Sequence, residues 1–279
     1  MLTRPRTWQA PFIFASPHSG RHYPSRFLAS SILDLPDLRR SEDAYVDTLL
    51  PDADDLGVPV LVARFPRAFV DVNRAANELD PGMFSSAQAL SGISRSNRVI
   101  AGFGVIPKLA AAGRAIYGRR LPSTEATARM EMCYWPYHET LQSLIDECKS
   151  IFGMAIVIDW HSMPSTSANG QPLADIILGN RYGASCDSSI CVPWQESFEE
   201  VNLNVRRNSP YAGGYVTTTY VRPLKGVHAL QIEINRGLYL DENRTHRLGL
   251  PYRRLRDQIA SAIGKVISGT LLPWRQAAE

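Results

Sequence analysis

Runs of apolar residues separated by helical patterns predict an α/β protein. Apolar, β-branched runs at 10–15, 58–63, 155–158 and 174–179 are typical of buried strands. The run 228–235 alternates between apolar and polar residues, as a strand with one buried face does. The alternation of strands with helices predicts a mixed, mostly parallel central sheet flanked by helices.

The segments between these strands carry the periodicity of amphipathic helices. Helices are predicted over 37–56, 108–121, 196–207 and 250–267, and from Ser123 toward Cys148. One shorter run, Ala68–Val72, has strand character.

The stretch Ala155–Ser165, AIVIDWHSMPS, is the centre of the chemistry that we predict. Its apolar half is followed abruptly by Asp159, His161 and Ser162. Ligands bind at the carboxyl ends of strands in open α/β sheets, so a histidine at this edge suits a metal ligand or a general base. A lone histidine is more often an ordinary core residue, and other residues must decide between the two.

A second predicted strand, 10–15, also ends in a His-Ser pair, His18-Ser19, which Gly20 follows. Two strand ends of this kind can converge on one site. The alternative is a polar turn, because Ser, Pro and Gly are all turn formers.

Three acids lie in the predicted helix 37–56 and present carboxylates over about one turn. They are Glu42, Asp43 and Asp47. Such a cluster is either a solvated helix face or the source of a carboxylate metal ligand, and the sequence does not choose among the three.

Polar residues also follow the run 68–72. Asn73 and Arg74 together offer an amide and a planar guanidinium, which suit a substrate carboxylate, and a surface salt bridge is the alternative. The strand 228–235 places Gln231, Glu233 and Asn235 on one face, which predicts a lined cavity.

Composition narrows the class of protein. The 279 residues carry a formal charge of only +3, with no basic run, which argues against a nucleic-acid partner. The four cysteines form no CxxC pair, so we expect no cysteine zinc site and a reduced, cytoplasmic chain. No apolar run has the length of a signal peptide core or a membrane span, so we expect no membrane partner. The oligomeric state stays open.

Two histidines and one carboxylate form a standard catalytic zinc set that leaves one position for water. Zinc lowers the pKa of that water and polarises a carbonyl group. Glu233 is placed to act as general acid and base, and an arginine can fix an anionic substrate. These parts together predict hydrolysis of an amide in a small molecule that bears a carboxylate.

The chain resembles the N-formylglutamate amidohydrolase family from about residue 11 to 245. Several blocks in the right order carry this resemblance. They are SPHSGRHYP, SEDAYVDTL, FPRAFVDVNRAANELDP, GRAIYGRRL, YWPYHETL, DWHSMPS, SPYAGGYVTTTY and HALQIEINRGLYLDE.

The resemblance implies one domain over 1–279 with a fold like that of the zinc carboxypeptidase-like exopeptidases. It implies one bound Zn²⁺, or another divalent metal, and hydrolysis of a small N-acyl amino acid, typified by N-formyl-L-glutamate. His18, Asp43 and His161 would be the metal ligands, and Glu233 the general acid/base.

The resemblance also implies residues that bind the substrate. Arg74 would bind a carboxylate of the substrate, with Arg67 and Arg236 as alternatives. Tyr211 or Tyr215 would cap the substrate. Asp159 would orient His161 through a hydrogen bond, unless the separation of two residues aims the two side chains apart.

One departure from the family sets this chain apart. The better-known deformylases of histidine degradation carry Asp-Thr-Asp-Trp-His where this chain has Arg-Ser-Glu-Asp-Ala-Tyr at 40–45. The acid equivalent to Asp43 is retained while its neighbours differ. The chain therefore resembles a divergent branch, and the resemblance implies the type of bond cleaved more firmly than it implies formylglutamate as the substrate.

Two other functions compete with this hypothesis. The first is a non-catalytic, metal-bearing protein that binds an N-acyl or acidic amino acid. The second is a metal-free serine hydrolase that uses Ser19 or Ser162, and the absence of a GxSxG motif weakens it.

Overall fold

The computed structural model describes residues 1–85, 93–94, 96–243 and 245–276, without the side chains of 271–276. The chain divides into two compact units. The first, here called the sheet unit, comprises Met1–Ser16, Tyr45–Val62 and Gln142–Glu279. The second, the loop-rich unit, comprises Pro17–Ala44 and Ala63–Leu141. The expectation of a single domain over 1–279 stays a prediction.

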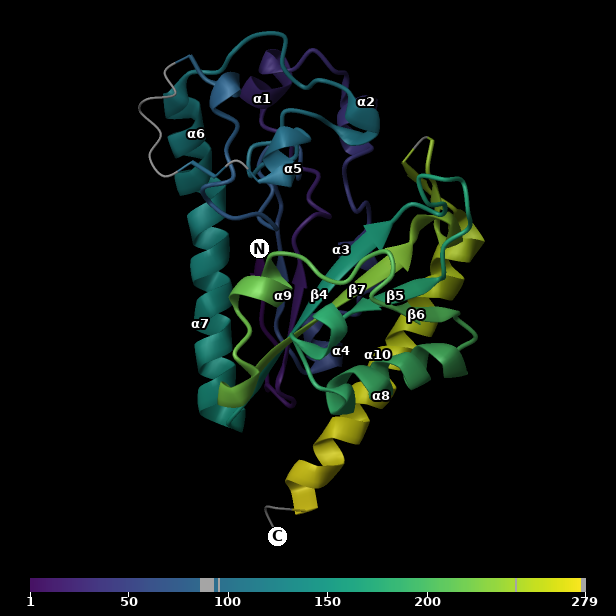
Figure 1. The fold of residues 1–279 in the computed structure, drawn as a ribbon. Coiled ribbons are helices and arrows are strands. Elements are labelled where there is room, and N and C mark those ends of the chain that lie inside the picture. Colours follow the sequence, from purple (N-terminus) through teal and green to yellow (C-terminus); the bar gives the residue numbers. More distant parts are fainter. Residues whose placement is uncertain (86–92, 95, 244, 277–279) are drawn as a thin grey trace. The chain divides into compact units, whose positions relative to one another are not determined.

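The sheet unit is built on seven strands in the order β1-β3-β2-β4-β7-β5-β6 (Figure 1). Four of the six pairings are parallel, and only β1–β3 and β5–β7 are antiparallel within the described residues. The strands are β1 (Leu2–Thr3), β2 (Phe12–Ser16), β3 (Val60–Val62), β4 (Ala155–Met163), β5 (Ile176–Gly179), β6 (Val205–Arg207) and β7 (Val227–Asn235). This confirms the predicted α/β class with a mixed, mostly parallel sheet.

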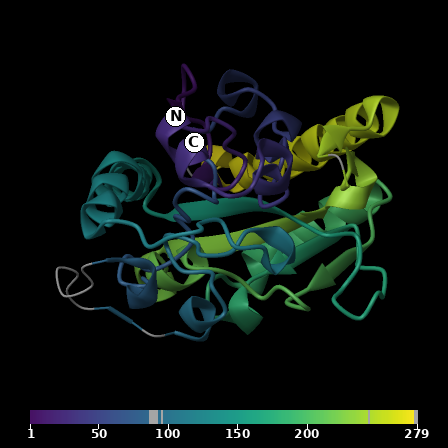
Figure 2. The same ribbon diagram turned by 90° about the horizontal axis from the view of Figure 1, so that it is seen from above.

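Helices cover the sheet within this unit. The α-helices are α3 (Val46–Leu49), α4 (Ala53–Leu56), α8 (Ser188–Glu200), α9 (Val216–Thr219) and α10 (Gly249–Gln276). The long α10 packs against α8, α3 and α4 and runs along one face of the sheet, as Figure 2 shows. Short 3-10 helices lie at Arg181–Gly183, Pro223–Lys225 and Arg236–Leu238, and β8 (Leu240–Asp241) pairs with β9 (His246–Arg247).

The loop-rich unit contains short helices and long connections. Its α-helices are α1 (Ser25–Ser30), α2 (Leu35–Arg39), α5 (Asn97–Ile100) and α6 (Ser123–Arg129). A π-helical turn, Met130–Tyr134, joins α6 to α7 (Trp135–Phe152), and 3-10 turns lie at Pro81–Met83 and Ala111–Gly113. The buried guanidinium of Arg129 lies 4.4–5.5 Å from the ring centroids of Phe27, Phe69 and Tyr117, of which Phe27 and Phe69 form part of this unit's core.

An aromatic cluster anchors β4 on one face of the sheet. Trp160 lies 5.5 Å from Phe14 and 5.7 Å from Trp194, measured between ring centroids, and all three are fully buried. Since side chains alternate along a strand, Trp160 on this face puts Asp159 and His161 on the other. The core therefore fixes which way the candidate site residues point.

The strand predictions are largely confirmed. β2, β3, β4 and β5 fall within or overlap the apolar runs that predicted them. The alternation in 228–235 predicted a half-buried strand, but all nine residues of β7 are buried, so its polar face is covered as well. β7 lies between β4 and β5, and both of its faces are covered.

Two of the predicted helices are broken by left-handed residues. The segment 37–56 is not one helix, because Tyr45 has φ +65° before α3 and Leu50 is extended before Pro51. The segment 108–121 forms only a 3-10 turn, where Ala112 has φ +60° and Gly113 φ +71°. Neither break leaves a clear mark in the hydrophobic pattern.

Two further predictions placed elements wrongly. The predicted helix 196–207 is shifted, because α8 ends at Glu200 and β6 follows after Asn202, which has φ +62°. The run 68–72 is a buried turn and not a strand, because the Phe69 N–H donates back to the Pro66 carbonyl. Helices were correctly predicted from Ser123 onward and over 250–267.

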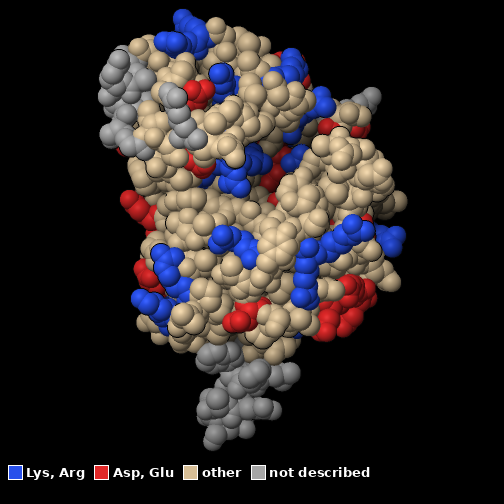
Figure 3. Space-filling model, viewed as in Figure 1, with Lys and Arg blue, Asp and Glu red and all other residues tan. Residues whose placement is uncertain are grey.

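Within the described residues, no helix is long and apolar enough to cross a bilayer. On the face drawn in Figure 3, lysine and arginine side chains lie in separate groups among acidic and uncharged residues.

Candidate active site

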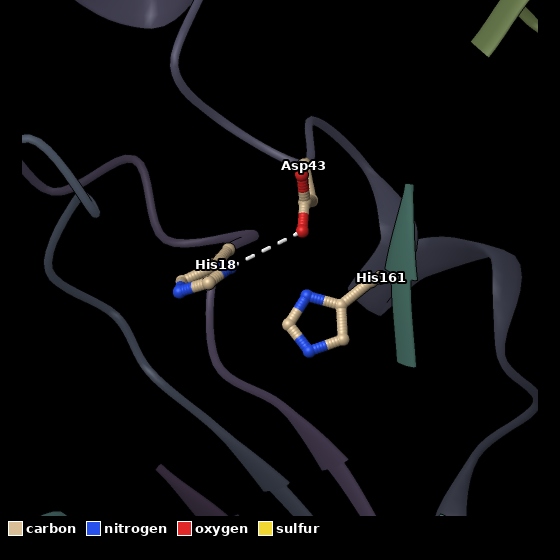
Figure 4. A group of neighbouring side chains, drawn as sticks. All are labelled: His18, Asp43 and His161. Atoms are coloured by element: carbon tan, nitrogen blue, oxygen red, sulfur yellow. Dashed lines mark ion pairs between the residues drawn. The ribbon is translucent and has the colours of Figure 1, made fainter. Parts of the chain in front are cut away.

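His18 is held between two buried carboxylates of the loop-rich unit. Its Nε2 lies 2.7 Å from Asp71 Oδ1, and its Nδ1 lies 3.3 Å from Asp43 Oδ2. All three side chains are at most 3% exposed. Figure 4 shows the Nδ1 edge of the ring directed at the Asp43 carboxylate. Each ring nitrogen of His18 therefore faces the carboxylate of a buried acid.

The backbone around His18 explains how the two acids reach it. The Asp43 N–H donates to the His18 carbonyl at 3.0 Å, which ties the two residues together. Gly20 lies so close to the backbone of 63–65 that a Cβ atom there would be 2.1 Å from the Phe65 carbonyl oxygen. The His18 segment can pass along this backbone only because Gly20 has no side chain.

Asp71 collects positive and N–H groups around its carboxylate. The Asn73 N–H donates to Oδ1 at 2.9 Å, and Arg67 Nε donates to Oδ2 at 3.2 Å. Arg74 Nη2 lies 3.7 Å from Oδ2. Burial would raise the pKa of Asp71, but Arg74, Arg67 and His18 hold it well below its usual range. Asp71 is therefore ionised and acts as an acceptor for His18.

Two of the three arginines predicted to bind substrate, Arg67 and Arg74, thus lie together beside Asp71. Arg74 also donates to two backbone carbonyls, that of Phe103 at 3.0 Å and that of Asn73 at 2.7 Å. Burial lowers the pKa of Arg74, and the charge of Asp71 opposes this effect. Arg74 is the more enclosed of the two, with 12% of its side chain exposed against 27% for Arg67.

The structure distinguishes the three acids that the sequence left open. Glu42 accepts hydrogen bonds from Tyr23 at 2.8 Å and Arg39 at 3.2 Å. Burial raises the pKa of Glu42, although these two partners oppose the shift. Asp47 lies on α3, and Asp43 is the acid whose carboxylate lies 3.3 Å from His18 Nδ1.

His161 lies inside β4 and not after it, because the strand continues to Met163. Its Nε2 lies 2.9 Å from Asp159 Oδ2, and both side chains are buried. Residues that are two positions apart on a strand point to the same face, so Asp159 and His161 lie side by side on β4. His18 and His161 therefore share one pattern, in which Nε2 is bound by an aspartate.

Glu233 lies beside His161 in the sheet unit. In the parallel register of β4 and β7, His161 pairs with Glu233 and Asp159 pairs with Gln231. Gln231 Nε2 donates to Glu233 Oε1 at 2.7 Å. A histidine, two carboxylates and an amide thus share one buried face, as the alternation in 228–235 predicted for the β7 residues.

The remaining candidates are Arg236, Tyr211 and Tyr215. Arg236 Nε donates to Ser162 Oγ at 2.9 Å, so the Ser162 hydroxyl is engaged by an arginine. Tyr211 packs against a small cluster that includes Met163 and Ile177, and Ile177 pairs with Glu233. Tyr215 precedes α9 and is half-buried.

Sequence reasoning missed two contributions to the site. The sequence assigns Asp71 no role, because nothing local connects it with His18, which lies 53 residues away. Gly179, the last residue of β5, allows the backbone of Ala212 and Gly213 to approach this strand. A Cβ atom at Gly179 would lie 2.8 Å from the Ala212 carbonyl carbon. A glycine at the end of a predicted strand is the signal that could have indicated this approach.

The sequence matches one known family over most of its length. The chain matches the N-formylglutamate amidohydrolase family over residues 10–240. It is 28% identical to the N-formylglutamate deformylase of Pseudomonas aeruginosa over 276 residues, covering 95% of this chain and 94% of that protein. The deformylase of Pseudomonas putida is also 28% identical, over 95% of this chain and 93% of its own length.

Solved structures agree with the sequence comparison. The N-formylglutamate amidohydrolase of Ralstonia eutropha JMP134 matches with a TM-score of 0.87 and 29% identity, over 97% of each chain. A gene product of Agrobacterium tumefaciens shares the fold, with a TM-score of 0.65 and 18% identity over 94% of this chain and 92% of its own. The chain belongs to the N-formylglutamate amidohydrolase family.

Proposed function

We propose that this protein is a metal-dependent amidohydrolase that cleaves the amide bond of a small N-acyl amino acid, with N-formyl-L-glutamate as the first candidate. Membership of the family supports the reaction type. The single observation that supports a bound metal ion is the environment of His18. When Nε2–H donates to Asp71, the Nδ1 lone pair faces the Asp43 carboxylate at 3.3 Å, and two buried acceptors repel unless a cation lies between them.

The proposed ligands are His18, Asp43 and His161, which Figure 4 draws. Two imidazoles and a carboxylate suit a catalytic zinc ion, one per chain, and can hold another divalent metal. Asp71 and Asp159 bind the Nε2 atoms of the two histidines, which leaves each Nδ1 as the metal-binding atom.

The course of the chain supports the third ligand. β2 ends at Ser16 beside β4, where Ala15 pairs with Asp159, and His18 follows two residues later. Two residues of extended chain span at most about 7 Å. The connection therefore keeps His18 within about 7 Å of the end of β2, the strand that pairs with β4 in the sheet unit.

The ion, when bound, supplies Lewis acidity for water and for the amide carbonyl. Glu233 accepts a proton from the attacking water and later donates it to the nitrogen of the leaving amine. Its place beside His161 in the register supports this role. Arg74 binds a carboxylate of the substrate, with Arg67 and Arg236 as alternatives, and Tyr215 or Tyr211 covers the bound molecule.

The test combines metal analysis with turnover. We expect about one zinc per chain and release of the acyl acid from a member of a panel of N-acyl amino acids. Activity should be lost after chelation and recovered on adding zinc. Metal without turnover on any panel member would favour the non-catalytic binding protein, and absence of metal would overturn the ligand assignment. Chelator-resistant activity with labelling by a serine-directed reagent would favour the serine hydrolase.

A further inference from the structure

Gln231 is a buried residue with a single side-chain hydrogen bond. It lies in the middle of β7 and is 4% exposed. Its Nε2 donates to Glu233 Oε1 at 2.7 Å, and its Oε1 is buried without a hydrogen-bond partner among the described residues. Glu233 is therefore the only group in the described part of the chain that orients this carboxamide.

Burial of this amide costs stability. A carboxamide with one half unsatisfied is less stable in a core than an apolar side chain of similar size. The register partners of Gln231 are Gly179 on β5, which has no side chain, and Asp159 on β4, whose ionised carboxylate offers no donor to the Gln231 carbonyl oxygen. Packing alone thus gives no reason for a glutamine at this position.

The orientation of the amide follows from the charge of its partner. The Gln231 NH₂ group faces Glu233 Oε1, which is the arrangement that an ionised carboxylate, able only to accept hydrogen bonds, requires. A hydrogen bond to a charged oxygen is short and directional, as the 2.7 Å distance is. Because Oε1 of Glu233 is held, the direction of Oε2 is set as well.

We propose that Gln231 is a positioning residue that holds the Glu233 carboxylate in the orientation needed for proton transfer. The inference rests on the proposed function, in which Glu233 is the general acid/base. Gln231 touches neither the substrate nor the metal in this scheme and acts only through Glu233. Since small misplacements of a reacting group cost large factors in rate, loss of the hydrogen bond should lower kcat more than it changes KM.

The experiment is a double-mutant cycle with Gln231→Met and Glu233→Met, both close in volume to the native side chains. The control is Gln258→Met on α10, where the amide donates to the Val201 carbonyl at 2.6 Å. Each variant is assayed for kcat and KM on the panel member that the wild type turns over, for zinc content and for its midpoint in urea.

We expect Gln231→Met to lower kcat by about 10- to 100-fold, with zinc content kept and the urea midpoint unchanged or raised. In the Glu233→Met background the same substitution should have no further effect on the residual rate. The Gln258→Met control should keep the wild-type kcat. An equal fall in both backgrounds, or a normal kcat in Gln231→Met, would overturn the proposal.

A failure of the proposed function would look different. If the wild type turns over no panel member, the urea midpoints still decide whether the two side chains are coupled. The four proteins compared are the wild type, Gln231→Met, Glu233→Met and the double variant. Non-additive shifts for Gln231→Met and Glu233→Met support the holding contact, and additive shifts overturn it.

Discussion

Asp71 Oδ1 lies 2.7 Å from His18 Nε2, across 53 residues of sequence. The contact fixes which nitrogen of His18 carries the proton and aims the other at Asp43. Asp71 can do this because Arg67 and Arg74 keep it ionised in a buried site. The same acid thus links the candidate metal ligand with the candidate substrate arginines.

Asp71→Asn should weaken zinc binding about 10- to 100-fold, as the loss of partners of metal-bound histidines typically does. The neutral amide neither strengthens the basicity of His18 nor balances the two arginines. Competition with a chromophoric chelator measures the zinc affinity. Asp257→Asn, at an exposed position of α10, is the matched control and should bind zinc as the wild type does. Unchanged affinity in Asp71→Asn would mean that His18 needs no such partner.

Glu233→Gln should lower kcat by about 10²- to 10⁴-fold, because an amide cannot accept the proton from water. The side chain keeps its shape, so binding of the substrate should be retained and can be measured by calorimetry. Wild-type turnover in this variant would remove Glu233 from the mechanism. Equal binding with no turnover in either protein would favour the non-catalytic alternative.

Gly20→Ala should destabilise the protein by about 1–3 kcal/mol, since the new methyl group would overlap the Phe65 carbonyl oxygen and force the backbone to shift. Gly264→Ala on α10 is the control, because a Cβ atom there meets nothing within 4 Å. It should be neutral or stabilising by up to about 1 kcal/mol, since alanine favours a helix. Urea unfolding measures both. Equal stability of the two variants would contradict the close approach at Gly20.

His228 should make stability depend on pH near neutrality. Burial lowers the pKa of His228 in the folded protein from about 6.5, and Asp187 only partly opposes this. A lowered folded pKa means that the unfolded chain binds more protons. The contribution of His228 is therefore fully present above about pH 6.5 and is lost as the pH falls toward the folded pKa.

The variant His228→Leu lacks this titrating group. When the pH is lowered from 7.5 to 5.5, the unfolding free energy of the variant should therefore fall less than that of the wild type. The difference in slope cannot exceed about 1.4 kcal/mol per pH unit for one proton. Urea titrations at several pH values measure it. Parallel curves for the two proteins would show that His228 titrates alike in both states.

Local patterns were sufficient to predict five of the seven strands and to select several residues of the candidate site. β2, β4 and β7 follow from apolar runs, and the polar residues at or near their carboxyl ends include His18, His161 and Glu233. These predictions need only the period of two along a strand and the rule that sites form at strand ends. The same period explains why Asp159 contacts His161.

The tertiary structure alone decided the rest. The choice of Asp43 over Glu42, the pairing of Asp71 with His18 and the burial of both faces of β7 depend on which distant segments meet. The helices predicted over 37–56 and 108–121 fail for a related reason. Their periodicity is local, whereas the left-handed residues that interrupt them are stable only because the surrounding structure holds them there.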